Sequence, residues 1–384
     1  MTRPLRAADF DYPLEEELIA QQPLQRRDQS RLMRLRRDGG AISHHVFRDL
    51  PALLRPDDLL VLNDTRVIPA RITCRRRTGG RIDGLFLREV KVGRWEVMLK
   101  GAGRCRPGEC LELAGADETL RLERNLGEGR WELDVLRAGE PVAAPAAELL
   151  ERVGSPPLPP YIRRGGRDDQ QAQAAEAAGQ TNAQPQVANQ PAPPSDDRIR
   201  YQTVYADRPG AIAAPTAGLH FTPELLAELE RGGMELARVT LHVALGTFAP
   251  VKREDLAEHP MHEEWYELTA ATADRLNAAR DAGRRIVAVG TTSVRVLESA
   301  VGPDGRFAPA SGWTRIFLYP PAAFRAVDAL ITNFHLPRST LLMLVAAFCK
   351  PGSTDGLPMI LRAYEEARRL RYRFYSYGDA MLIE

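Results

Sequence analysis

Polar residues that could bind a substrate stand directly after apolar runs at three places in the second half of the sequence. The three stretches read "APTAGLHFTPE" from Ala214, "VAVGTTSVRVLES" from Val287 and "LITNFHLPRSTLLMLVAAF" from Leu330. Their glycines let the backbone approach a ligand closely, and their hydroxyls and free helix N-terminal amides bind anions such as carboxylate or phosphate. Because an open α/β sheet binds ligands outside the carboxyl ends of its strands, the three stretches predict one shared pocket.

These stretches contain most of the candidate substrate-binding residues. Arg295 lies three residues after Thr292, so both side chains should face the same side of the helix that begins there. A well-capped helix beside a solvated loop would give the same local pattern, and this alternative stays open for each stretch alone. The candidates are Thr216, Gly218, Gly290, Thr291, Thr292, Ser293, Arg295, Asn333 and Ser339.

Histidines are the candidate catalytic groups, because five of the seven lie in this half of the chain and neutral histidine suits general acid–base chemistry. We single out His220, His262 and His335, together with Glu264 as the acidic candidate beside His262. The stretch "HPMHEEW" suggests a metal site, but Pro260 interrupts any helix and the sequence has no HExxH spacing, so we expect no metal. Each histidine could instead be satisfied within the fold, and Glu264 could belong to a solvated charged face.

Alternating strand and helix patterns must position these residues. Apolar runs at 59–62, 285–289 and 327–331 predict buried strands. A helix should follow the last of these runs, because Ser339 or its neighbour can cap a series of strong helix formers. The aromatic-rich run at 372–377 predicts the final strand.

Short strand patterns separated by glycine turns occupy residues 72–150 and predict a small barrel or sandwich. We therefore expect the fold class α/β, with a layered α/β main domain and an inserted small β-domain. The main domain would be discontinuous and comprise 1–71 and 151–384. Within it, residues 167–197 are rich in Gln, Ala, Asn and Pro and have too little apolar surface to offset their ordering entropy. They predict a disordered insertion without a catalytic role.

Composition limits the class of protein. The chain has 384 residues, of which 44% are hydrophobic and 27% charged, with a net charge of +1, as is typical of a soluble globular protein. Only four of the 52 basic residues are lysines, and the planar fork of arginine suits phosphate, so an RNA partner is permitted but not required. The four cysteines form no CxxC pair, and the sequence has neither a signal-peptide pattern nor a long apolar run. We therefore expect a reduced, cytoplasmic protein without a membrane segment.

Motifs that occur in a fixed order give the chain a resemblance to a known family. It resembles the S-adenosylmethionine:tRNA ribosyltransferase-isomerases of queuosine biosynthesis over nearly its whole length, apart from residues 167–197 and, more loosely, the β-domain. The resemblance implies that the inserted domain is a small β-barrel. The ten motifs are "VLNDTRVIPAR", "LPPYI", "YQTVYA", "APTAGLHFT", "LHVALGTF", "PMHEEWY", "AVGTTSVRVLES", "IFLYPP", "LITNFHLPRSTLLMLVAAF" and "YRFYSYGDAMLI".

The resemblance implies an enzyme that attaches the ribosyl moiety of S-adenosylmethionine to 7-aminomethyl-7-deazaguanine at the anticodon wobble position of tRNA. Rearrangement would give epoxyqueuosine-tRNA, with release of adenine and L-methionine. S-adenosylmethionine would be a consumed co-substrate, and neither a cofactor nor a metal would be needed. We expect a monomer that binds tRNA and no membrane. The same motifs add candidate substrate-binding residues, namely Asn63, Thr65, Arg66, His242, Gly246 and Thr247.

The sequence departs from the usual family pattern at Ala244, at "YPPA" from Tyr319 and at Ile199, which concerns loop geometry rather than the reaction. Which candidate acts as base or acid stays open. Two rival functions also remain. An S-adenosylmethionine-dependent tRNA methyltransferase would want a glycine-rich loop after its first strand, where this chain has "NDTRV". A non-enzymatic RNA-binding module would not explain polar clusters at three strand ends.

Overall fold

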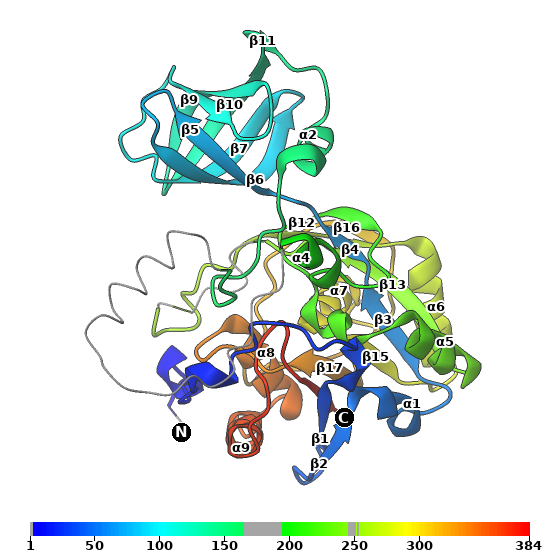
Figure 1. Ribbon diagram of the computed structural model, residues 1–384. Helices are drawn as coiled ribbons and strands as arrows, with labels where there is room; N and C mark the ends of the chain where they lie inside the picture. Colours follow the sequence, from blue (N-terminus) through cyan, green and yellow to red (C-terminus); the bar gives the residue numbers. More distant parts are fainter. Residues whose placement is uncertain (1–2, 165–193, 245–250, 252) are drawn as a thin grey trace. The chain divides into compact units, whose positions relative to one another are not determined.

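Two compact units make up the chain (Figure 1). The structure is a computed structural model that describes residues 3–164, 194–244, 251 and 253–384. The α/β unit comprises Met1–Thr65, Pro159–Arg208 and Pro215–Glu384, and the barrel unit comprises Arg66–Leu158 and Pro209–Ala214. The predicted α/β fold with an inserted small β-barrel is confirmed. The barrel unit begins at Arg66, whereas the sequence placed this change of character at residue 72.

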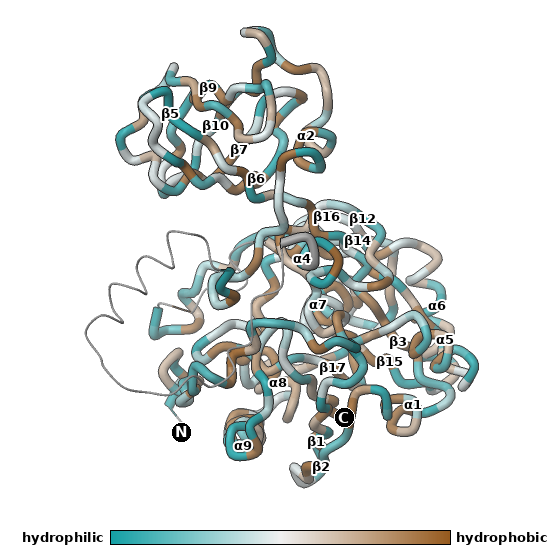
Figure 2. Tube along the Cα trace, in the orientation of Figure 1, coloured by the Kyte–Doolittle hydropathy of each residue, from teal (hydrophilic) through white to brown (hydrophobic). Residues whose placement is uncertain are grey.

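A nine-stranded mixed sheet forms the centre of the α/β unit. In sheet order its strands are β16 (Ala310–Thr314), β14 (Glu264–Leu268), β13 (Glu235–Leu241), β3 (Leu59–Asn63), β15 (Ile286–Val289), β17 (Ala329–Asn333), β18 (Ala380–Ile383), β1 (Arg31–Leu35) and β2 (Ile42–Val46). The four neighbours β13, β3, β15 and β17 run parallel to one another. Parallel strands covered on both faces consist of nearly continuous apolar residues. Accordingly, β3, β15 and β17 are buried at every position and are largely apolar (Figure 2).

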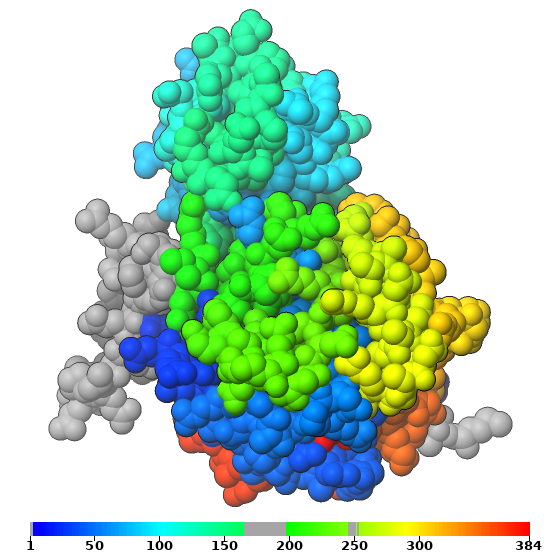
Figure 3. All heavy atoms as spheres, turned by 90° about the vertical axis from the view of Figure 1, so that its right-hand side faces the viewer, coloured from blue at the N-terminus to red at the C-terminus, as the bar shows by residue number. Residues whose placement is uncertain are grey.

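Helices and 3-10 turns surround this sheet. They are η1 (Ala7–Phe10), η2 (Glu16–Leu18), η3 (Arg27–Gln29), η4 (Phe47–Asp49), α1 (Leu50–Leu53), α4 (Pro194–Arg200), η5 (Thr216–His220), α5 (Pro223–Arg231), α6 (Ala270–Asp281), α7 (Thr291–Ala300), α8 (Thr340–Cys349) and α9 (Gly356–Arg369). Side chains of α5 and α6 form adjacent parts of one outer face (Figure 3), whereas α7 packs against β13, β15 and β14 and is buried over most of its length. Among the helices that the structure describes, none is long and apolar enough to cross a membrane.

Side-chain caps fix where three of these helices begin. Thr222 caps α5, Thr269 caps α6 and Ser339 caps α8, and each hydroxyl oxygen accepts a hydrogen bond from a backbone amide three residues later. The predicted cap of the helix after residue 331 is therefore confirmed at Ser339. Each cap satisfies a backbone amide of the first turn that has no partner within its helix.

A closed antiparallel barrel forms the second unit. Its sheet order is β11 (Glu140–Pro141), β10 (Arg130–Arg137), β7 (Arg94–Lys100), β6 (Arg81–Lys91), β5 (Arg71–Arg76), β8 (Cys110–Leu113) and β9 (Glu118–Gly127), and pairing of β10 with β9 closes it. Inward positions alternate with outward ones, and the interior holds Trp95, Trp131 and the apolar face of α2 (Ala146–Val153). A separate two-stranded sheet consists of β4 (Thr65–Val67) and β12 (Arg208–Ala211).

The predicted final strand at residues 372–377 is wrong. The last strand is β18, and Phe374 makes only an isolated bridge with Ile19. Arg371 and Tyr375 have φ angles of 53° and 70°, which place them in the left-handed region and break an extended chain. The alternating aromatic residues are buried in a loop, so the alternation does not reflect a pleated strand.

The prediction of a disordered insertion at 167–197 is wrong at its C-terminal end. Residues 167–193 lie outside the described residues, but residues 194–197 belong to α4. Asp197 is buried and accepts hydrogen bonds from Arg164 at 2.7 and 2.9 Å and from the Tyr377 hydroxyl at 2.9 Å. The ion pair between Asp197 and Arg164 therefore holds this end of the predicted insertion in place, although the insertion has too little apolar surface to be ordered by burial.

Candidate functional site

The three predicted polar stretches meet at one edge of the α/β sheet. β3, β15 and β17 are parallel neighbours, so Asn63, Gly290 and Asn333 stand at the same end of adjacent strands. Hydrogen bonds join the stretches there: Asn63 donates to Thr292 Oγ1 at 3.1 Å, and Thr216 donates to Asn333 Oδ1 at 2.8 Å. The parallel pairing therefore brings Asn63, Gly290 and Asn333 together, whereas Thr216 reaches Asn333 from η5, which follows β12 of a separate sheet.

His220 lies in η5, its side chain is buried, and each of its ring nitrogens has a hydrogen-bond partner. Its Nε2 accepts from the Asn333 amide at 3.0 Å, which places the ring proton on Nδ1, 2.7 Å from Ser30 Oγ. The ring stacks on Phe47 with centroids 5.0 Å apart. Burial, with smaller contributions from the charges of Arg373 and Arg27, lowers the pKa of His220 to about 3. The ring is thus neutral at physiological pH.

His335 lies in a comparable environment just after β17. Its Nε2 is 2.8 Å from Thr332 Oγ1, and its backbone amide donates to the Tyr364 hydroxyl at 2.9 Å. Burial lowers the pKa of His335 to about 3. Both rings can therefore exchange hydrogen bonds with neutral polar groups, but neither is protonated enough near neutral pH to donate a proton as an acid.

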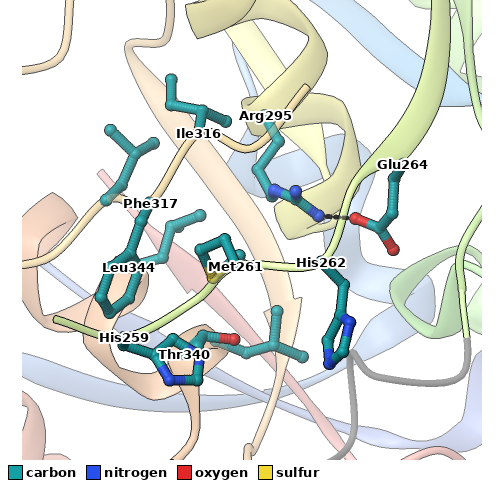
Figure 4. A pocket seen from close by; sticks show the side chains of 11 residues that line it. His259, Met261, His262, Glu264, Arg295, Ile316, Phe317, Thr340 and Leu344 are labelled. Carbon is teal, nitrogen blue, oxygen red and sulfur yellow. Dashed lines mark ion pairs between the residues drawn. The ribbon is translucent and has the colours of Figure 1, made fainter. Parts of the chain in front are cut away.

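Glu264 and Arg295 form a buried ion pair beside a cleft. Glu264 begins β14 and Arg295 lies on α7, and both side chains are almost completely buried. Figure 4 shows the guanidinium between Glu264 on one side and the apolar wall of the cleft on the other. Burial lowers the pKa of Arg295 to about 10, which leaves it charged at neutral pH. The alternative that Glu264 belongs to a solvated face is wrong.

Three small clefts lie along this edge and share residues. The first has a volume of about 440 Å³ including its open mouth, and it is lined by His259, Met261, His262, Glu264, Arg295, Ile316, Phe317, Leu318, Thr340, Leu341 and Leu344. Leu341 also borders a second cleft, which Thr216, Asn333 and His335 line. Ser376 joins that cleft to a third, which contains His220.

Several predicted substrate-binding residues use their polar atoms within the fold. Asn63 bonds both backbone groups of Leu241 at 3.0 and 3.1 Å, and so fixes β13 against β3. Ser293 donates to the Val289 carbonyl, and Ser339 caps α8. A Cβ at Gly218 would stand 2.0 Å from the Tyr205 hydroxyl oxygen, so close packing accounts for this glycine.

The remaining candidates are distributed as follows. Thr65 Oγ1 is 2.8 Å from His242 Nδ1, and the His242 ring stacks on Trp265. Thr291 is buried in the first turn of α7 beside Gly290, whose φ of 87° suits glycine. Arg66 belongs to the barrel unit, where it lies 4.0 Å from Glu151. Gly246 and Thr247 lie outside the described residues.

Aromatic residues of the second cleft were missed in the sequence. Tyr161 and Tyr375 line it with ring centroids 4.6 Å apart, and the Tyr161 hydroxyl is 2.7 Å from Ser376 Oγ. The motifs "LPPYI" and "YRFYSYGDAMLI" contain all three residues and were the available signal. Within the described part of the chain, no group of three or more His, Cys, Asp or Glu side chains is arranged to hold a metal ion.

We predict that acid destabilises the protein through its two neutral histidines. The pKa of His220 and of His335 falls from 6.5 to about 3 on folding, so below pH 6.5 the unfolded chain binds more protons and the free energy of unfolding decreases. Each histidine should lower it by about 2 kcal/mol between about pH 6.5 and about pH 5. Urea denaturation at these two pH values measures the change.

The variants His335→Gln and His44→Gln separate this effect from general acid sensitivity. His335→Gln should remove about half of the pH dependence attributed to the two rings, whereas His44→Gln, at an exposed position of β2, should leave it intact. Full wild-type pH dependence in His335→Gln would contradict the proposed neutral state of this ring.

Comparison with known proteins gives the family. The model of the family described as "Queuosine biosynthesis protein" matches residues 7–383. A protein of Carboxydothermus hydrogenoformans named S-adenosylmethionine:tRNA ribosyltransferase-isomerase is 46% identical over 388 residues, which cover 99% of this chain and 100% of the relative. A protein of Pelobacter propionicus with the same name is 47% identical over 378 residues, which cover 98% and 99%.

A solved structure agrees with these relatives. The crystal structure of S-adenosylmethionine tRNA ribosyltransferase from Thermotoga maritima is similar with a TM-score of 0.52 and 34% identity, over 98% of this chain and 100% of that one. The similarity thus extends along almost the whole sequence, and it confirms the resemblance that the ordered motifs indicated. The chain belongs to the queuosine biosynthesis protein family and is an enzyme of that family.

Proposed function

We propose that the chain transfers and isomerises the ribosyl moiety of S-adenosylmethionine onto 7-aminomethyl-7-deazaguanine at the anticodon wobble position of tRNA. The products are epoxyqueuosine-tRNA, adenine and L-methionine. One observation carries the proposal: the motif residues of η5, α7 and the end of β17 converge on connected clefts at a single sheet edge. The names of the relatives support the same reaction.

The reaction needs a base, polar partners for the sugar and a binding site for the departing adenine. A proton must leave the carbon beside the sulfonium, the aminomethyl nitrogen must attack, and adenine and methionine must depart. His262 is exposed at the first cleft, and histidine is a common general base near neutral pH. We therefore assign proton transfer to His262 rather than to the buried rings of His220 and His335.

The buried polar network suits positioning rather than proton transfer. His220 and His335 are neutral and hydrogen bonded. We propose that His220 orients Asn333 and Thr332 orients His335, and that Asn333 and His335, which both line the second cleft, meet neutral groups such as sugar hydroxyls. Tyr161 and Tyr375 offer aromatic surface to a nucleobase. Glu264 holds Arg295 in place.

We propose that S-adenosylmethionine is consumed as a co-substrate and that neither a metal nor a further cofactor takes part. Every bond change in the proposed reaction is polar, so proton transfer and charge stabilisation by side chains are sufficient. A monomeric state and a cytoplasmic location stay predictions from the sequence. The alternative of a tRNA methyltransferase differs in which group of the same co-substrate reaches the tRNA, and its products distinguish it.

Product analysis tests the function. We expect that mixing the protein with S-adenosylmethionine and tRNA containing 7-aminomethyl-7-deazaguanine releases adenine and methionine in equal amounts, and that mass spectrometry finds epoxyqueuosine in the digested tRNA. Unmodified guanine at the wobble position lacks the nucleophilic amine, so the matching tRNA with guanine is the control. Release of S-adenosylhomocysteine with a methylated nucleoside would establish the methyltransferase instead.

Arginines on the barrel provide a prediction about tRNA. Arg71 and Arg75 face outward on β5, Arg77 follows it, and none of the three has an ion-pair partner among the described residues. Changing all three to Ala should weaken tRNA binding and reduce the slope of log affinity against log salt by about two units, because each contact with a phosphate releases a counterion. Affinity measured at several salt concentrations gives the slope.

The control removes three arginines that already have carboxylate partners. Arg81, Arg88 and Arg124 pair with Asp83, Glu96 and Glu132, so the triple Ala variant removes the same charge but should change the slope less. Equal slopes for the two triple variants would show that the three arginines without partners make no specific contact with tRNA.

A further inference from the structure

The Arg295 side chain has donors that the protein leaves unused. Nη1 pairs with Glu264, but Nε and Nη2 have no hydrogen-bond partner among the described residues, and both atoms are shielded from solvent. Arg295 lies on α7, in the wall of the first cleft. Buried donors on a charged group without a partner are strongly unfavourable, so their presence beside a cleft points to a ligand.

The unused atoms form the edge of arginine that recognises a carboxylate. Nε and Nη2 point the same way and donate two parallel hydrogen bonds to a planar pair of oxygens. The same edge binds carboxylates elsewhere in this chain, as in Arg285 with Asp58 at 2.8 and 2.6 Å and Arg368 with Glu15 at 3.0 and 2.6 Å. In Arg295 this edge makes no hydrogen bond to the described residues.

Glu264 fixes the guanidinium without using that edge. Its Oε2 pairs with Nη1, and its Oε1 accepts from the Ala244 amide at 3.0 Å. The carboxylate is therefore held by two segments of the chain, and the buried helix α7 fixes the other end of the arginine. A second anion can bind on the Nε side with the guanidinium between the two negative charges.

The rest of the cleft favours a small carboxylate with an apolar chain. Met261, Ile316, Phe317 and Leu344 form an apolar part of its wall, and polar residues that include His259, His262 and Thr340 line the rest (Figure 4). A carboxylate has only two oxygens, and the donor edge satisfies both, whereas a tRNA phosphate would place further oxygens against the apolar part of the wall, where they lose water. An α-amino-acid group linked to methylenes and sulfur matches both the donor edge and the apolar wall.

We propose that the Nε–Nη2 edge of Arg295 binds the carboxylate of the amino-acid portion of S-adenosylmethionine, and that the wall formed by Met261 and Leu344 contacts its methylene chain. The inference rests on the proposed function and adds the orientation of the substrate. The sulfonium then lies on the side of the cleft toward Leu341, next to the second cleft. Arg295 is a positioning residue. Its contact with the carboxylate also keeps L-methionine bound after the carbon–sulfur bond breaks and before product release.

The test compares S-adenosylmethionine with its decarboxylated form, which keeps the amine and the sulfonium. By isothermal titration calorimetry, the wild-type protein should bind the decarboxylated form about 100-fold more weakly, since loss of one partner of a buried hydrogen-bonded charge pair is costly. Arg295→Lys keeps a charge for Glu264 but loses the planar fork. Its discrimination between the two ligands should fall below about tenfold.

Arg315→Lys is the matched control, because Arg315 is exposed and pairs with Glu263 near the same cleft. It should keep the wild-type discrimination. Equal affinity of the wild-type protein for both ligands would overturn the inference while leaving the proposed function intact, and so would undiminished discrimination by Arg295→Lys. Should Arg295→Lys fail to fold, the wild-type comparison still decides. A wild-type protein that binds no S-adenosylmethionine would overturn the proposed function itself.

Discussion

Parallel pairing of β3 with β13 and β15, and of β15 with β17, is the constraint on which the site depends. It places the carboxyl ends of four strands at one edge, so residues more than 200 positions apart, such as Asn63 and Thr292, can meet there. The connections between parallel strands place helices on the faces of the sheet, so β3, β15 and β17 are buried and largely apolar. Asn63 also fixes the register of β13 against β3, because its side chain bonds both backbone groups of Leu241.

We propose that the candidate site separates polar groups that maintain the fold from groups that bind a substrate. The rings of His220 and His335 are neutral and held by Ser30, Asn333 and Thr332, which makes them rigid parts of the wall. Arg295 differs, because Glu264 occupies only one of its nitrogens. A site built in this way has its polar wall fixed before substrate arrives, which lowers the entropy that binding must overcome.

The local parts of this arrangement could be predicted from the sequence, and the pairings between distant segments could not. All-apolar runs identified the strands around Leu60 and Ile331, and hydroxyl spacing identified the cap at Ser339. The run at 372–377 led to the wrong prediction of a strand, because alternating aromatic residues are typical of strands. The positive φ of Tyr375, which interrupts an extended chain, could not be seen in the sequence. Partners such as Glu264 for Arg295 depend on which strands are neighbours, and the sequence alone does not determine that.

The most direct test of the central claim is a crystal structure of the protein with S-adenosylmethionine bound in the absence of tRNA. We expect the ligand at the carboxyl edge of β3, β15 and β17, in the clefts that contain Arg295, Phe317 and Tyr375. The structure also has a basic cleft beside Arg285 and Arg55, where β15 and β3 begin. A ligand bound in that cleft, or in the barrel unit, would contradict the placement of the substrate site at the carboxyl edge of the sheet.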